Sequence, residues 1–434
     1  MAIPQPIRDL SPPLLASALY AVGSGLFHTL LPLRLAAEGH SAAAVGLAVT
    51  GYSGGFLLGC LLSERLIVLV GHVRACAAFC AAAAAAVLGF DWPLPLVLII
   101  ALQVVGGCSA AALATVTESW LNERVLPAWR GRLLTIYVIL LSLCWGLGQV
   151  IAIGVAPTGS RLLILAALFH ALSLVPIVAL KVESPPVPAP IRLQWLRAFR
   201  VSPVGVMCCL YTGLVAGTFA GIGPLYGATV GFGQQDIVIL MAVMQIGGLV
   251  LQWPVGALSD RFDRRFLMLG MAMAMAVVAI GFLGVGPATP FWIACILFAA
   301  LGGLSDAFYP VGVAHTNDRA QAGEYVALSS NLLLIWAGGR TAGPLVGTAT
   351  LDAGGGDGFF LYVLGLSLLL GLYVAWRLAR RRRGLLREET VIYPQTSPTV
   401  FQWSPHRPLD PGPPEQAAGH TPDDANNQPK GPAP

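Results

Sequence analysis

Long apolar stretches, separated by short polar segments, recur from the N-terminal region to residue 376. Leu14 to Leu33 is the first of them, a run of about 20 residues without a formal charge. A helix of about 20 apolar residues crosses a hydrocarbon core of ~30 Å and satisfies its own backbone hydrogen bonds there. The pattern therefore predicts transmembrane helices.

Twelve runs of this kind predict twelve membrane-spanning helices. They lie near residues 14–35, 44–62, 73–90, 94–117, 133–156, 162–180, 204–228, 237–258, 266–286, 290–315, 325–350 and 359–376. The first run exceeds the apolar core of a secretory signal, and no cleavage-site pattern follows it, so we expect it to be retained. The predicted fold class is all-α integral membrane protein.

The composition supports this class. Of the 434 residues, 56% are hydrophobic and 11% are charged, and the mean hydropathy is +0.74. The eight cysteines all lie inside or at the edge of apolar runs and form no CxxC pair, so we interpret them as small packing residues. The sequence predicts no metal site and no cofactor.

The basic residues are distributed unevenly about the predicted helices. If the N-terminus is cytoplasmic, 22 of the 25 Lys and Arg residues fall on the cytoplasmic side, and the exceptions are Arg34, Arg161 and Arg340. This bias predicts that both termini are cytoplasmic. It also explains the arginines without nucleic-acid binding. Only two lysines, with abundant Ala and Gly, suggest a GC-rich bacterial genome and hence the bacterial inner membrane.

The longest interior connection divides the helices six from six. We predict an N-terminal bundle over 1–180, a cytoplasmic linker over 181–203, a C-terminal bundle over 204–377 and a disordered cytoplasmic tail over 378–434. The tail begins with "RRRR" and continues as a Pro-rich polar segment, which lacks the apolar content to bury a core.

The linker contains "IRLQWLRAFR" after a Pro-rich stretch. Its apolar residues recur every four positions and its arginines supply charge, which is typical of a helix lying on the membrane surface. The residues concerned are Ile191, Trp195 and Phe199, with Arg192, Arg197 and Arg200. A plain loop remains the alternative.

The two halves share short motifs at a nearly constant offset. "GLFHTLLPL" (25–33) matches "GTFAGIGPL" (217–225) at an offset of 192, which also pairs Gly39 with Gly231 and Gly55 with Gly247. "GGCS" (106–109) matches "GGLS" (302–305) at 196, and Gly148 matches Gly343 at 195. The common order predicts two pseudo-symmetric six-helix bundles related by an axis along the membrane normal.

The decapeptide "GALSDRFDRR" (256–265) holds five charges between two apolar runs. Its pattern G-x-L-x-D-R-x-x-R-R resembles the signature loop of the major facilitator superfamily (MFS). The stretches "TESWLNERVLPAWRGRLLTIY", "WGLGQ" and "GGLSDAFYPVGVAH" look like the bacterial YcaD-type permeases. The resemblance covers roughly residues 10 to 380. It implies the MFS fold and alternating access, in which two bundles rock around a central cavity, but it leaves the cargo open.

The charged loop is a candidate gate between the bundles. In the resembled fold Asp260 faces the inner end of the fifth helix, near Arg132, where a helix N-terminus and a guanidinium both favour a carboxylate. We predict that this contact latches the state closed to the cytoplasm, with solvated loop charges as the alternative. The gating set is Gly256, Leu258, Asp260, Arg261, Arg264, Arg265 and Arg132. The first half has Val68 and Leu69 opposite Asp260 and Arg261, so the latch is asymmetric.

Ionisable residues inside membrane helices are functional candidates, because burying them there is costly. Four occur: His28, Glu118, Asp306 and Arg340. Tyr20, Ser24 and His28 share one helix face, as do Asp306 and Tyr309, while Gln149 and Gln245 add hydrogen-bonding groups.

Each of the four ionisable residues has two interpretations. Asp306 and Arg340 either pair directly, or Arg340 binds an anionic substrate group. Glu118 either pairs with Arg130, Arg132 or Arg264, or carries a proton. His28 is either a packing residue or a substrate ligand.

We predict a secondary active transporter that moves a small solute by alternating access and is coupled to protons. No GxxxxGK[ST] loop is present to use ATP, and no HExxH or GxSxG motif indicates an intramembrane enzyme. A passive uniporter, or a non-transporting sensor or scaffold, is the alternative. We expect a monomer whose partners are a small-molecule substrate, protons and membrane lipids, with no nucleic acid.

Overall fold

The computed structural model describes residues 5–124, 127–153, 156, 158–178, 194–320 and 325–381, all within one compact unit. The regular elements of these residues are helices. They are α1 (Gln5–Ala37), α2 (Ala42–Val70), α3 (His72–Gly89), α4 (Leu96–Arg124), α5 (Pro127–Ile151), α6 (Ser160–Leu172), α7 (Leu174–Val178), α8 (Trp195–Val201), α9 (Pro203–Thr229), α10 (Gln234–Arg261), α11 (Arg264–Gly281), α12 (Phe291–Asn317) and α13 (Tyr325–Arg381).

Each of the twelve predicted apolar runs coincides with a helix or a helix arm. Nine helices in the described residues are long and apolar enough to cross a membrane, and α6 with α7 forms one of them. The two arms of α9 are bent by 51°, and α5 contains a shorter apolar helix over Ile136–Ile151. Helix α13 is interrupted at Gly354 and Gly355, so it makes two arms where two helices are predicted. The predicted all-α membrane fold is confirmed.

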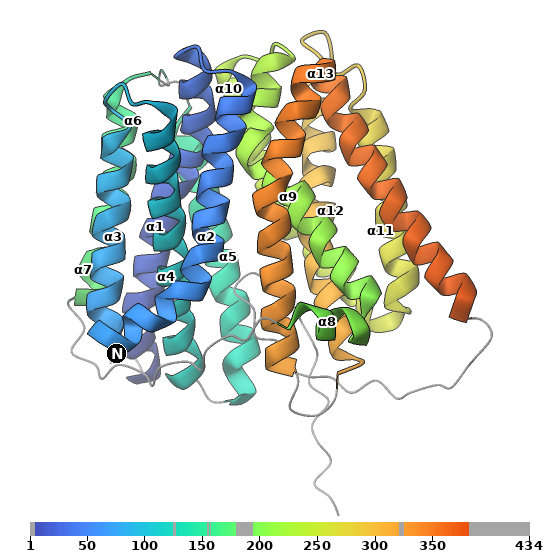
Figure 1. Ribbon diagram of the computed structural model, residues 1–434, viewed down its shortest axis with the longest axis horizontal. Coiled ribbons are helices and arrows are strands. Elements are labelled where there is room, and N and C mark those ends of the chain that lie inside the picture. Colours follow the sequence, from blue (N-terminus) through green and yellow to red (C-terminus); the bar gives the residue numbers. More distant parts are fainter. Residues whose placement is uncertain are drawn as a thin grey trace, which may run out of the picture. The chain divides into compact units, whose positions relative to one another are not determined.

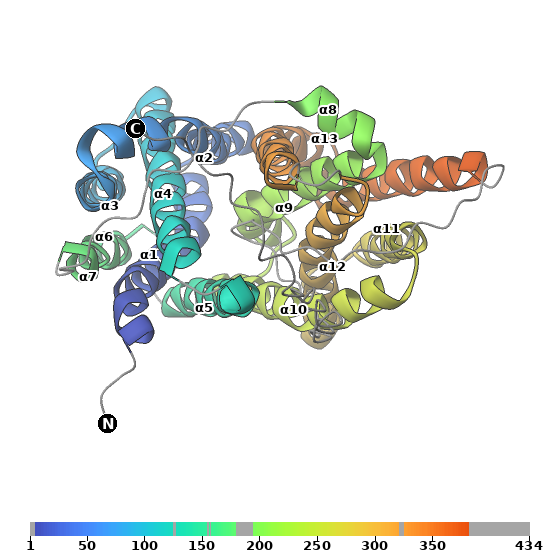
Figure 2. The ribbon, with the colours of Figure 1, turned by 90° about the horizontal axis from the view of Figure 1, so that it is seen from below.

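The helices form two groups, which contact each other through a few pairs of helices. Figure 2 shows α1 to α7 on one side and α9 to α13 on the other, with α2 beside α13 and α5 beside α10, and these are contacting pairs. The short helix α8 and the start of α1 lie at the same end of the bundle in Figure 1, which we call the α8 end.

The sequence repeat reappears as matching helix contacts. A Cβ atom added to Gly107 of α4 would overlap the carbonyl oxygen of Tyr52 in α2, and one added to Gly302 of α12 would overlap that of Met244 in α10. The equivalent residues are therefore Gly107 and Gly302, at an offset of 195. The alignment that pairs Gly106 with Gly302 at 196 is wrong by one residue, because Gly106 faces the ring of Tyr52 instead.

The same correspondence links the helix pairs α1–α5 and α9–α13. Gly148 packs against the carbonyl of Val22, and Gly343 packs against that of Leu214, at offsets of 195 and 192. Only glycine permits such close backbone approach between membrane helices. The pseudo-symmetry predicted from short motifs is thus a symmetry of backbone contacts.

The turns that end the first helix of each half are also equivalent. Gly39 and Gly231 have φ angles of +87° and +91°, a conformation that glycine adopts without steric cost. Each turn closes with paired backbone hydrogen bonds back to the last helical turn. The predicted offset of 192 places both glycines correctly.

The described part of the predicted linker contains a short helix, α8. In α8, Trp195 and Phe199 are 53% and 42% exposed while Ala198 is buried, as expected of a helix that presents apolar side chains to lipid. Ile191 and Arg192 lie outside the described residues, as do residues 382–434, which include nearly all of the predicted tail. Helix α13 continues to Arg381, beyond the boundary predicted at residue 377.

Candidate functional site

A cavity of about 330 Å³ lies between the two groups of helices. Residues from α1, α2, α4, α5, α9, α10, α12 and α13 line it. Seven of the eight residues predicted for the substrate or proton pathway are among them: Tyr20, His28, Gln149, Gln245, Asp306, Tyr309 and Arg340. The eighth, Glu118, is not a lining residue.

Aromatic rings form the wall contributed by the first half. The imidazole of His28 stacks on the indole of Trp145, with ring centroids 5.3 Å apart and an interplanar angle of 8°. The ring of Tyr52 meets the same imidazole edge-on at 4.1 Å. These three rings, from α1, α5 and α2, present flat apolar faces with a few polar edges.

Charged groups lie on the wall contributed by the second half. The Arg340 guanidinium lies 5.2 Å from the centroid of the Trp336 ring, and Tyr309 lies 5.8 Å from the same ring. Arg340 is within electrostatic range of Asp306 and Tyr52. Among the described residues, however, Arg340 and Asp306 form no direct ion pair within 4.0 Å.

Trp145 and Arg340 occupy equivalent positions in the two halves. A Cβ atom on Gly25 would meet the carbonyl of Trp145, and one on Gly217 would meet that of Arg340. The cavity is therefore asymmetric, with an aromatic side chain where the other half has a cation. Tyr52, Trp145 and Trp336 were missed as site residues, although the offset of 195 that pairs Gly148 with Gly343 also pairs Trp145 with Arg340.

The shared face predicted for helix α1 does line the cavity. Tyr20, Ser24 and His28 are all lining residues. Ser24 is already engaged, because its hydroxyl lies 3.2 Å from Nε2 of His170, and the Tyr20 hydroxyl donates to the carbonyl of Gly106 at 3.3 Å. Of the three, His28 is the one whose contacts are with other cavity-lining rings.

Glu118 lies behind the cavity wall in a small polar cluster. Its Oε1 is buried and has no hydrogen-bond partner among the described residues. Its neighbour Thr117 shares a hydrogen bond of 2.8 Å with Ser17, and Glu118 itself lies within electrostatic range of Tyr137. Both Ser17 and Tyr137 line the cavity, so the carboxyl lies close behind its wall.

The structure describes the side chain of only one of the three arginines predicted as partners of Glu118. Arg264 pairs with other groups, described next, and the side chains of Arg130 and Arg132 lie outside the described residues.

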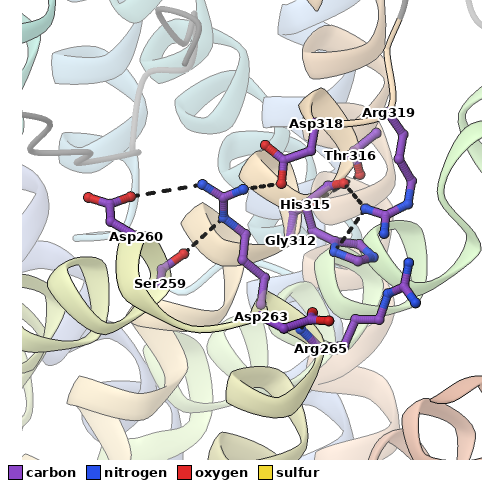
Figure 3. Close-up of polar contacts among 10 residues, drawn as sticks. Ser259, Asp260, Asp263, Arg265, Gly312, His315, Thr316, Asp318 and Arg319 are labelled. Atoms are coloured by element: carbon purple, nitrogen blue, oxygen red, sulfur yellow. Dashed lines mark hydrogen bonds and ion pairs between the residues drawn. The ribbon is translucent and has the colours of Figure 1, made fainter. Parts of the chain in front are cut away.

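The charged loop forms a network within the second half. The Arg264 Nε donates to the Ser259 hydroxyl at 3.1 Å, and its guanidinium pairs with Asp318 and, at 3.8 Å, with Asp260 (Figure 3). Arg264 thereby joins α11 to the ends of α10 and α12. Asp263 accepts a hydrogen bond from the backbone N–H of Arg265 and so caps α11.

The other predicted gating residues are more exposed. Leu258 is 41% exposed, Arg261 is exposed, and a Cβ atom on Gly256 would meet no atom of the described residues within 4 Å. Because the Arg132 side chain lies outside the described residues, the contact of Asp260 with α5 stays a prediction.

Replacing Arg264 with Gln is expected to destabilise the α8 end of the second half. The Arg264 side chain is only 12% exposed, and the loss of its guanidinium leaves Asp318 and Ser259 without this partner. We expect a loss of about 1–3 kcal/mol, measured as a lower thermal midpoint of the purified protein. Arg261→Gln, an exposed arginine three residues earlier, is the control, and an equal loss in both variants would contradict this role.

Comparison with known proteins shows the family to which the chain belongs. The family model described as Major Facilitator Superfamily matches residues 14–305 and 239–405, so the chain belongs to that superfamily and is a multi-pass membrane transporter. It is 28% identical over 328 residues to a protein of Escherichia fergusonii named "Uncharacterized MFS-type transporter YcaD", covering 75% of this chain and 84% of that protein.

Solved structures share the fold. A mutant of the nucleoside transporter NupG superposes with a TM-score of 0.71 and 12% identity, over 85% of this chain and 99% of that chain. A D-xylose–proton symporter superposes with a TM-score of 0.65 and 15% identity, over 85% and 96%. At these identities the likeness concerns the fold alone, and the predicted MFS fold is confirmed.

Proposed function

We propose that the protein is a secondary active transporter that moves a small organic anion by alternating access and couples its movement to protons at Asp306. The observation that carries this proposal is the chemistry of the central cavity. Of the lining residues that the structure describes, Arg340 is the one arginine or lysine and Asp306 the one carboxylate. A cation held in the membrane interior without a direct ion pair is suited to an anionic ligand.

The other lining residues favour an anion that carries a flat, aromatic or unsaturated group. A volume of about 330 Å³ is at the small end of the range for ligand pockets. The Trp145 and Trp336 rings lie on opposite halves, and the Gln149 and Gln245 amides add hydrogen-bonding groups. A carboxylate on Arg340 and an aromatic or unsaturated ring between the indoles would use both features.

The charge balance of the cavity supports the proposal of proton coupling. An ionised Asp306 competes with an anionic substrate for Arg340, and a protonated Asp306 does not. Binding of substrate and proton would therefore be mutually favourable. Glu118, whose buried Oε1 has no hydrogen-bond partner in the described part of the chain, is the second candidate for a proton carrier.

The proposal includes the orientation of the chain in the membrane and the movement of its two halves. Both termini would face the cytoplasm, with the two halves rocking as units about the linker at residues 181–203. The basic-residue bias supports this orientation, and the bacterial relatives support the inner membrane. We expect the monomer to suffice, because the cavity is lined by helices of both halves of one chain.

The test uses purified full-length protein in liposomes and matched pairs of probes. Benzoate and indole-3-acetate are compared with their neutral amides, with an imposed proton gradient and after its collapse by an ionophore. Uptake of the carboxylates alone, lost on collapse, is expected. Transport of the amides at equal rates would overturn the anion proposal, and gradient-independent carboxylate flux would identify a uniporter.

Replacing Asp306 with Asn is expected to separate binding from coupling. The amide removes the competing charge and cannot take up a proton, so the variant should still exchange labelled carboxylate across the membrane. It should lose gradient-driven accumulation by at least about tenfold. Glu118→Gln is made in parallel, and accumulation lost there but retained in Asp306→Asn would assign the coupling to Glu118 instead.

A further inference from the structure

A second cavity, of about 310 Å³, lies at the α8 end of the second half. Side chains from five separate segments converge on it: α8, the start of α9, the first turn of α11, the end of α12 with the turn after it, and the last turns of α13. Its lining residues are Arg200, Val201, Ser202, Pro203, Val204, Arg265, His315, Arg319, Arg377 and Arg380. We call it the basic cavity.

The charge of this cavity is one-sided. Among the described residues ten line it, of which six are Arg or His and none is acidic. Arg319 donates to Nδ1 of the buried His315 at 3.1 Å and to its backbone carbonyl at 2.6 Å. Figure 3 shows the guanidinium groups of Arg265 and Arg319 turned toward the same space beside His315. Like charges held this close repel each other unless an anion lies between them.

Two described carboxylates that are close in sequence to the lining arginines, Asp318 and Asp263, have other partners. Asp318 pairs with Arg264, on the side away from Arg319 in Figure 3. Asp263 accepts the backbone N–H of Arg265 at 2.9 Å, as the cap of α11. Among the described residues, neither one lines the basic cavity. The lining residues that the structure describes therefore supply positive charge that an anionic ligand would match.

The surroundings place the cavity at the level of lipid headgroups. Trp195, Leu196 and Phe199 of α8 are each at least 42% exposed and lead directly to Arg200. On the other side Arg380 lies over the Trp376 ring, 4.4 Å from its centroid, at the end of the last membrane helix. Exposed tryptophans next to arginines are typical of the membrane–water interface.

We propose that the basic cavity binds a phosphate-bearing anion, supplied by the headgroup of an anionic lipid. Several guanidinium groups that converge from different helices match the oxygens of a phosphate, which arginine binds through paired N–H donors. Basic pockets between helices at the cytoplasmic surface are suited to such headgroups. The bound phosphate joins the ends of α9, α11, α12 and α13, so it stabilises the second half.

The experiment uses full-length protein in detergent, titrated with phosphatidylglycerol, with phosphatidylcholine or with inorganic phosphate, and follows the thermal midpoint. Wild-type protein is expected to be stabilised by phosphatidylglycerol and not by phosphatidylcholine. The double variant Arg265→Gln/Arg377→Gln should need about tenfold more phosphatidylglycerol for the same shift. Arg74→Gln, which removes an exposed arginine from the first turn of α3, is the matched control and should behave as wild type.

Three other results of the titration would overturn either the lipid as the source of the phosphate or the site itself. Stabilisation by inorganic phosphate as strong as that by the lipid, lost in the double variant, would keep the phosphate site and overturn the lipid as its source. An equal loss in Arg74→Gln and the double variant would overturn the site, because the effect would be one of general charge. If the double variant does not fold, Arg200→Gln on the exposed face of α8 replaces it, and an unchanged titration there overturns the proposal.

Discussion

Replacing Arg340 with Gln is expected to reduce carboxylate uptake in proteoliposomes to the background of empty vesicles. Among the described residues that line the central cavity, Arg340 is the one arginine or lysine, and no direct ion pair with Asp306 neutralises it. Two charge-assisted hydrogen bonds to a carboxylate contribute about 3 kcal/mol or more in such a site, so binding should weaken by about 100-fold or more.

Two further variants separate binding from structure. Arg340→Lys keeps the charge but loses the planar pair of donors, so partial uptake with a raised KM is expected. Trp336→Phe removes the indole beneath the guanidinium, which lies 5.2 Å away, and should weaken binding only slightly. Unchanged uptake by Arg340→Gln, at wild-type expression and thermal midpoint, would show that the anion binds elsewhere.

The sequence predicted most of the fold because a membrane helix is specified locally. About 20 apolar residues define a span whatever its neighbours are, so the twelve runs coincide with helices or helix arms. The break in α13 at Gly354 and Gly355 also falls between two predicted runs. The repeat was one residue off at Gly106, because adjacent glycines look alike in sequence and differ only in which backbone they contact.

The candidate site was predicted for its ionisable and amide side chains but not for most of its aromatic rings. A charge inside an apolar run is conspicuous, which is why His28, Asp306 and Arg340 were found. Tyr52 and Trp145 were not, because an aromatic residue in a membrane helix is as common against lipid as against a cavity. Their roles depend on the meeting of α1, α2 and α5, which no single helix pattern specifies.

The basic cavity could not be predicted from the sequence either, although its charged residues are easily seen there. Its arginines were interpreted as signals of orientation, and each fits that role when it is considered alone. What the sequence does not show is that Arg265, His315 and Arg377 belong to one cavity although they lie on three different helices. The number of arginines on one side of the membrane indicates only the orientation of the chain. Their convergence on one cavity is what indicates a binding site.

Replacing Gly148 with Ala is expected to disrupt the packing of α1 against α5. The added methyl group would overlap the carbonyl oxygen of Val22, which belongs to the backbone of a helix and cannot rotate away. The two helices must separate, at a cost of about 1–3 kcal/mol or more. Because alanine is the better helix former, the loss arises from packing between helices and not from helix propensity.

The control for this packing lies on the same helix. Gly146→Ala, two residues earlier in α5, would bring its Cβ only to ordinary contact with Gln245 at 3.9 Å, so it should keep the wild-type thermal midpoint or raise it slightly. The pseudo-symmetry adds a second test, because Gly343→Ala should lose stability as Gly148→Ala does, through overlap with the carbonyl of Leu214. Thermal inactivation half-lives in one detergent compare all three variants. Equal half-lives for Gly146→Ala and Gly148→Ala would contradict the close approach of α1 and α5.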